Sequence, residues 1–282
     1  MKIAKLTLFL ILFLTNHLFA QLYNAKESEP NNLEKEKEIK IKNNVSESFE
    51  YIRQNNSTDS ILKSHKRYNK NGDLLTNTIF SAKQDTINYA AYEYGGEKLV
   101  KSNSFTKNKN VRVFNDIRTF FYDEKGNNNE IQVINKDGKI IYQKIDYNNN
   151  NLKEALNTKW LNKTHYSITE GYFYSNNNNL IKKKTYCPNG NLFSEIKYQY
   201  DKLGNLIGYY RFQNGKKDII GYYSYDKDSN LIESGFEYLF GNKPNAYKTK
   251  YEYDSNNNII KKHYFVDNIL KYTNIISYKK FE

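Results

Sequence analysis

Apolar and polar residues alternate along most of this chain with a period of two. In Tyr198-Gln199-Tyr200 the two tyrosines would point to one face of a strand and the glutamine to the other. Tyrosine, phenylalanine, isoleucine and threonine are frequent in such stretches, and all four are favourable on a pleated surface. The pattern therefore predicts β-strands.

A tyrosine that stands just before a turn signal recurs about every 26 residues. Its positions are Tyr68, Tyr94, Tyr122, Tyr147, Tyr174, Tyr200, Tyr225 and Tyr253. A weaker set of turns lies between them, as in Tyr186–Leu192 and Ile134–Ile140, so turn signals arrive every 12 to 14 residues. Each unit should hold two strands, and short strands at this spacing are typical of an all-β repeat array.

The clearest unit, Tyr198–Ile207, predicts a β-hairpin with a type I turn. Asp201 suits the first turn position because its carboxylate accepts hydrogen bonds from nearby backbone N–H groups. Gly204 suits the left-handed position because it has no Cβ to clash. In other copies the left-handed position is held by two asparagines and by a serine that should be strained there: Asn178, Asn257 and Ser229.

These signals predict an all-β fold: an elongated antiparallel sheet of repeated β-hairpins, either extended or curled. We expect a signal peptide at 1–20, a polar leader at 21–48 that is either disordered or a frayed helix, and the hairpin array at 49–282. An irregular first hairpin is expected to cap the array, because end repeats shield the stack from solvent.

The first twenty residues have the pattern of a secretory signal peptide. Lys2 and Lys5 precede a short apolar run, Leu6–Leu14, and Ala20 is a suitable cleavage residue. The run is too short for a comfortable membrane span, and no later segment is expected to cross a bilayer as a helix. We expect a secreted, periplasmic or outer-surface protein that begins near Gln21.

The formal net charge is +12, and because residues 1–20 hold two lysines and no acid it would be +10 after cleavage. A basic exported protein suits anionic polysaccharide, lipopolysaccharide or phosphate-bearing surfaces. Codon bias toward lysine explains the same charge without a function, and the run Lys182–Lys184 would then mark a solvated edge of the sheet. No nucleic-acid partner is expected.

Residue patterns for catalysis, metal binding or cofactor binding are not found in the sequence. His65, His165 and His263 are about 100 residues apart, each in a strand-like segment, where packing is the usual role. Asp226–Asn230 begins like a calcium loop but lacks the glycine and glutamate that complete one, and turn chemistry explains its oxygens. We expect no enzyme, no metal and no cofactor, and we assign no ligand-binding residues.

Two residue types leave a binding role open. Cys187, the only cysteine, is either a reactive thiol or an incidental turn residue. The 27 tyrosines could stack on sugar rings, although their period favours packing. A site, where one exists, is expected where the repeat breaks: near Gly95-Gly96, around Trp160, or at Leu239–Tyr247.

The unit Tyr-x-Tyr-Asp-x-x-Gly-Asn-Leu-Ile at Tyr198–Ile207 resembles the YD repeat of Rhs-type bacterial surface and toxin proteins. Tyr186–Leu192 is similar to the Tyr-x-x-Asn-Gly-x-Leu repeat of MORN-like bacterial antitoxins. The YD resemblance covers roughly residues 60 to 282 and implies an exported hairpin array with carbohydrate binding. Larger relatives curl into a shell, but this chain is expected to hold too few repeats for a large shell.

The sequence thus favours an exported, non-enzymatic repeat protein with a binding or scaffold role at the bacterial cell envelope. Its partner would be a glycan, anionic or neutral, or a surface protein. One alternative is an immunity or antitoxin-like partner of a toxin, suggested by the Asn-Gly turns. Another is a polysaccharide-active enzyme that uses scattered carboxylates.

Overall fold

The computed structural model describes residues 37–55, 57–81, 83, 85–108, 111–159, 167–239 and 245–282. The described residues form an all-β fold in which one sheet holds eighteen strands. A short helix at residues 37–42 precedes the first strand, within the leader expected to be either disordered or a frayed helix. The expected signal peptide lies outside the described residues.

The strands follow the alternating segments of the sequence. Their bounds are Val45–Gln54 (β1), Ile61–Tyr68 (β2), Leu74–Phe80 (β3), Thr86–Gly95 (β4), Lys98–Asn108 (β5), Val111–Tyr122 (β6), Asn128–Asn135 (β7), Ile140–Tyr147 (β8), Lys153–Lys159 (β9), Ser167–Tyr174 (β10), Leu180–Tyr186 (β11), Leu192–Tyr200 (β12), Leu206–Gln213 (β13), Lys216–Tyr225 (β14), Leu231–Tyr238 (β15), Asn245–Tyr253 (β16), Ile259–Val266 (β17) and Ile269–Lys280 (β18).

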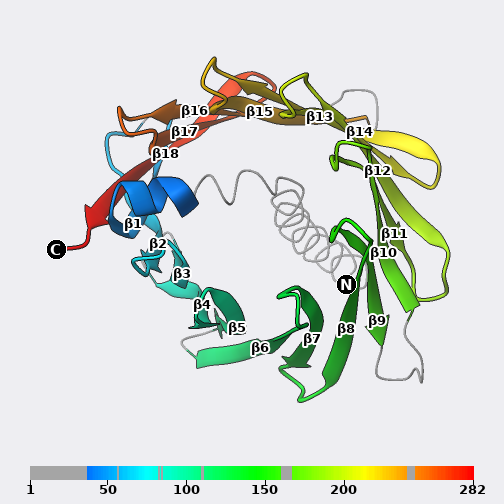
Figure 1. Ribbon diagram of the computed structural model, residues 1–282. Helices are drawn as coiled ribbons and strands as arrows, with labels where there is room; N and C mark the ends of the chain where they lie inside the picture. The colour runs from blue at the N-terminus through cyan, green and yellow to red at the C-terminus, as the bar shows by residue number, and fades with distance from the viewer. Residues whose placement is uncertain are drawn as a thin grey trace, which may run out of the picture.

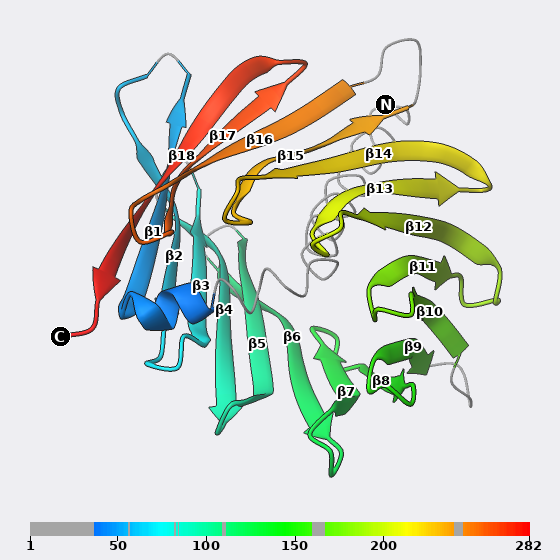
Figure 2. The ribbon, with the colours of Figure 1, turned by 45° about the horizontal axis from the view of Figure 1, so that its top comes forward.

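The sheet closes on itself. Every strand pairs antiparallel with the next along the chain, and β1 also pairs with β18, so that Ser48 lies opposite Tyr278. The strands form a ring in Figure 1, and the turned view of Figure 2 shows neighbours side by side around the wall. The expectation of an open elongated or curled sheet is therefore wrong: the protein is a closed antiparallel barrel. The first hairpin does not cap an array but supplies the closing strand.

A β-bulge at each repeat explains the closure. The register shifts between the marked tyrosine and the residue before it, for example between Phe173 and Tyr174, Gln199 and Tyr200, and Glu252 and Tyr253. The other repeats have the same shift at Tyr68, Tyr94, Tyr122, Tyr147 and Tyr225. A bulge bends its strand and increases the twist, so a bulge in every unit curves the sheet continuously. The number of repeats is consequently sufficient for a barrel.

Seven of the eight marked tyrosines, all except Tyr68, connect consecutive units, and Tyr278 does the same. The hydroxyl of Tyr200 donates to the carbonyl of Leu180 at 2.9 Å, where the strand of the preceding unit begins. Equivalent bonds of 2.7–3.1 Å run from Tyr94, Tyr122, Tyr147, Tyr174, Tyr225, Tyr253 and Tyr278. Each bond gives a backbone carbonyl of the preceding unit a side-chain donor. We call this set the tyrosine ladder.

The predicted turn chemistry is confirmed. The carboxylate of Asp201 accepts from the backbone N–H groups of Leu203 and Asn205 at 2.9 and 2.8 Å. Gly204 has a φ of 85°, and its N–H donates to the carbonyl of Asp201. The equivalent residues of other copies are also left-handed, including Asn178, Asn257 and the strained Ser229.

Residues near both ends of the described chain hold the closing seam. The N–H of Phe281 donates to the carbonyl of Asn44 at 2.9 Å. Before β1, the ammonium of Lys37 pairs with the carboxylate of Asp73 at 2.6 Å, which ties the short helix to the turn after β2. No helix of the described residues is long and apolar enough to cross a membrane.

The left-handed turn position gives a direct stability test. Replacing Gly204 by Val should lower the free energy of unfolding by roughly 1–3 kcal/mol, because a β-branched residue is strained at positive φ. No side chain or backbone lies within 4 Å of a Cβ at this position, so the loss would come from the backbone alone. Chemical denaturation measures it, and Gly204→Asn is the matched control that should lose much less. Equal losses would refute the turn assignment.

Burial of the tyrosine ladder predicts instability in alkali. Desolvation, with a smaller contribution from Tyr174, raises the pKa of Tyr200 to about 12, above the unfolded value near 10. Because the folded state keeps this proton to a higher pH, the contribution of Tyr200 to stability should be constant below about pH 10 and be lost between about pH 10 and 12. Urea midpoints measured across this range should fall less steeply for Tyr200→Phe, whereas Tyr210→Phe should behave as wild type. A midpoint independent of pH would contradict the assignment.

Candidate functional site

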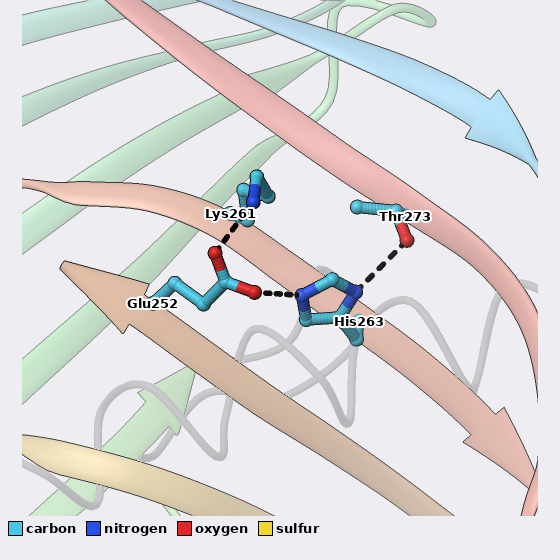
Figure 3. A network of polar contacts seen from close by, with 4 residues as sticks. All are labelled: Glu252, Lys261, His263 and Thr273. Atoms are coloured by element: carbon cyan, nitrogen blue, oxygen red, sulfur yellow. Dashed lines mark hydrogen bonds and ion pairs between the residues drawn. The ribbon is translucent and has the colours of Figure 1, made fainter. Parts of the chain in front are cut away.

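A polar network crosses three strands near the seam (Figure 3). Glu252 of β16 contacts His263 of β17 at 2.7 Å between Oε1 and Nε2, and Lys261 Nζ lies 2.6 Å from the second carboxylate oxygen. His263 Nδ1 lies 2.9 Å from Thr273 Oγ1 of β18. The hydrogen bonds from Lys261 and then from His263 hold the pKa of Glu252 below its ordinary value.

The order carboxylate, imidazole, hydroxyl is also the order of a nucleophilic catalytic triad. With His263 Nε2 donating to Glu252, the neutral ring would accept the hydroxyl proton of Thr273 at Nδ1. Thr273, however, is only 5% exposed, so a substrate carbonyl has no access to its hydroxyl. The network is therefore best explained as a set of side-chain hydrogen bonds that connect β16, β17 and β18.

Figure 3 also separates the two faces of the wall. The four side chains lie on the viewer's side of β16–β18, and strands of the opposite wall are visible behind them, so they belong to the outer face. Side chains alternate along a strand, which places the ladder residue Tyr253, next to Glu252, on the inner face. The same alternation holds in each repeat, so the tyrosine ladder lines the inner face.

The inner face contains the most buried polar residues. Asn274 has 0% exposure, and its amide donates to Glu50 Oε1, while Ser64 donates to Glu50 Oε2 at 3.2 Å. Burial alone would raise the pKa of Glu50, but the charges of Lys262 and Lys63 and the Asn274 bond lower it to about 2. The carboxylate is thus held ionised in the wall next to the seam.

The outer face of β10–β14 gathers lysines and aromatic rings. Side chains in two adjacent cross-strand rows form what we call the lysine–aromatic surface: Phe173, Lys182, Lys184, Glu195, Lys197, Tyr210, Phe212 and Lys217. One row runs from Phe173 through Lys182 and Lys197 to Tyr210. The other runs from Lys184 through Glu195 and Phe212 to Lys217. This surface therefore holds four ammonium groups and one carboxylate.

Each ring of this surface lies beneath an ammonium group. Lys182 Nζ is 4.4 Å from the ring centroid of Phe173, and Lys217 Nζ is 4.2 Å from that of Tyr210. Lys197 Nζ lies 5.1 Å above the ring of Phe212. Such contacts hold a cation over the negative face of a ring. The ammonium groups are thereby presented at the outside of the wall.

The structure separates the histidines that the sequence singled out. His65 contacts Glu47 at 2.6 Å and stacks on Phe49 with centroids 4.5 Å apart, on the outer face. His263 belongs to the network of Figure 3. His165 and Trp160 lie outside the described residues. Only the hairpin register, which places His263 opposite Thr273, could have indicated the network.

Turn geometry accounts for the other candidates. Asp226 Oδ1 accepts from the backbone N–H groups of Asp228 and Asn230, as the turn requires, and Oδ2 accepts from the side-chain amide of Asn230. Among the residues that the structure describes, no group of three or more His, Cys, Asp or Glu could hold a metal ion. Cys187 is half-buried in the turn after β11, where its carbonyl accepts from Gly190.

The positions where the repeat breaks bring no chemistry together within the described residues. Gly96 adopts positive φ in a turn with open space around it. Tyr247 stacks on Phe236 with centroids 5.0 Å apart, which is packing between neighbouring strands. Residues 240–244, in the third predicted break, are outside the described part of the chain.

Comparison with known proteins finds no family model and no curated protein that matches this chain. Among solved structures, "TcdB2-TccC3-TEV" has a TM-score of 0.33 at 14% identity over 80% of this chain, which spans 14% of that chain. Porin-like proteins from Bacteroides uniformis and Bacteroides vulgatus have TM-scores of 0.42 and 0.31 at 6% and 12% identity. The match to the Bacteroides uniformis protein covers 83% of this chain and 98% of that protein's chain. The match to the Bacteroides vulgatus protein covers 84% of this chain and 99% of that protein's chain. Similarity at this level carries no inference about function.

The buried Glu50 predicts a specific response to acid. Glu50→Gln should lower the free energy of unfolding by about 3 kcal/mol at neutral pH, because the nearby lysines lose a buried partner. Since the folded pKa is depressed to about 2, the advantage of the wild type should be complete above about pH 4.5 and shrink as the pH falls toward 2.

Urea denaturation of both proteins between pH 2 and 7 measures this difference. Glu97→Gln, in an exposed turn, is the control and should match the wild type throughout. A difference between wild type and Glu50→Gln that stays constant down to pH 2 would rule out the proposed ionisation of Glu50.

Proposed function

We propose that this chain is an exported, non-enzymatic binding protein of the bacterial cell envelope, and that it binds an anionic partner on the lysine–aromatic surface. The observation that supports the proposal most directly is the excess of ammonium groups there. Lys184 and Lys197 share Glu195, at 3.9 and 3.4 Å. Among the described residues, no carboxylate lies within ion-pair distance of Lys182 or Lys217.

The charged side chains of the outer face support the proposal that the outside of the barrel is in contact with water. Charged pairs lie within the strands on this face in several parts of the barrel, such as Glu93 with Lys101 and Glu233 with Lys250. Charges at such positions are costly against lipid, where barrels carry an apolar band. A surface of this kind is accessible to a soluble or surface-bound partner.

Export is supported by the pattern of residues 1–20, which predicts cleavage near Ala20 and a secreted, periplasmic or outer-surface protein. The absence of enzymatic activity is supported by the burial of Thr273, the hydroxyl of the most triad-like group in the described structure.

Retention of envelope material tests the proposal. Immobilised protein should retain a component of solubilised envelope fractions, and Lys182→Gln/Lys197→Gln should reduce this retention by roughly tenfold, because two lost charge contacts of roughly 0.7 kcal/mol each amount to about 1.4 kcal/mol.

The control is Lys144→Gln/Lys250→Gln, which removes two outer-face lysines that are 58% and 52% exposed and lie 3.7 Å from acidic partners. It has the same net charge as the test variant. Retention that is lost equally in both variants, or is absent from the wild type, would refute the proposed function.

A further inference from the structure

We propose that the ligand of the lysine–aromatic surface is an acidic polysaccharide whose chain runs across strands β10 to β14. This inference rests on the proposed binding function and specifies its chemical class. It follows from the pairing of the lysines across strands, from their spacing, and from the absence of arginine and of uncovered aromatic rings on this surface.

The pairing of Lys182 and Lys197 is unfavourable without a ligand. The two residues are directly opposite each other on adjacent antiparallel strands. Like charges in this arrangement destabilise a sheet. The side chains extend over different rings, Phe173 and Phe212, and only Lys197 has an acid within reach, Glu195. An anionic group between them would remove the repulsion.

The spacing suits a polymer. Neighbouring strands are about 4.8 Å apart, so the rows cross five strands over roughly 19 Å, and the two rows are separated by about 7 Å along the strands. Ammonium groups occur at β11, β12 and β14 along this path. A single small anion could contact only neighbouring lysines, whereas a chain with a repeated negative charge could contact all of them.

The residue types favour a polysaccharide over a protein. Protein interfaces are enriched in arginine and depleted in lysine, and the lysine–aromatic surface has four lysines and no arginine. Lysine is a point charge without the fork geometry that selects planar, bidentate groups, so it suits charges whose orientation varies along a flexible chain.

The rings give a reason to exclude single-stranded nucleic acid. Base stacking needs exposed aromatic faces. Here the rings of Phe173, Tyr210 and Phe212 lie beneath ammonium groups at 4.2–5.1 Å. These contacts instead hold the charges in place, which reduces the conformational entropy lost on binding.

Affinity electrophoresis with polygalacturonate and with neutral dextran tests the proposal on the full chain. The wild type should be retarded by polygalacturonate and not by dextran. Lys182→Gln/Lys197→Gln should weaken binding at least about tenfold and reduce the slope of log K against log salt by roughly one to two. Lys144→Gln/Lys250→Gln should bind as the wild type, and Lys182→Arg/Lys197→Arg should retain most of the affinity.

Thermal unfolding at low salt is a second readout. Removing the repulsion by Lys182→Gln/Lys197→Gln should leave the melting temperature unchanged or raise it, so weaker binding cannot be attributed to misfolding. Equal loss of binding in the control double variant would show that net charge alone is responsible and would overturn the proposal. So would single-stranded DNA binding at least as tightly as polygalacturonate.

The two proposals fail in different ways. If envelope material is retained through Lys182 and Lys197 but polygalacturonate neither binds nor competes, the polysaccharide inference is wrong and the binding function stands. If no envelope material depends on these lysines, the binding function itself is wrong.

Discussion

The barrel depends on the bond from each ladder tyrosine to a backbone carbonyl of the preceding unit. Except at Tyr278, the bond occurs where the register shifts, so the interaction that connects two hairpins lies at a point where the sheet bends. Repeated around the wall, it gives a curvature that brings β18 against β1. Closure removes the free edges that an open array of hairpins would have exposed.

Closure also gives the two sides of each strand different roles. The run Lys182–Lys184 illustrates this. Lys183 points inward, where it is 7% exposed and pairs with Glu170 at 2.8 Å, whereas Lys182 and Lys184 point outward over Phe173. The run therefore does not mark an edge of the sheet, because β11 is paired on both sides. One lysine stabilises the wall and its two neighbours form part of the proposed binding surface.

The proposed surface lies within the regular repeats and not at their irregular points. Hairpin geometry fixes the ladder tyrosine and the turn residues, but the outward-facing positions between them are free to vary. In β10–β14 these positions hold an excess of lysine, whereas in β16–β18 they hold the network of Glu252, His263 and Thr273. A regular scaffold thus presents different chemistry on different parts of one wall.

The sequence by itself determined the features that depend on near neighbours. Alternation predicted the strands, and Asp201 and Gly204 predicted the turn, because strand and turn preferences act within a few residues. Closure could not be predicted in this way, since it depends on the summed curvature of many bulges and on the contact of β1 with a strand more than 200 residues away. The outer surface likewise required the register, which places Lys182 opposite Lys197 and His263 opposite Thr273. Only the tertiary structure decided which residues share a face, because a shift of one residue would exchange the two faces.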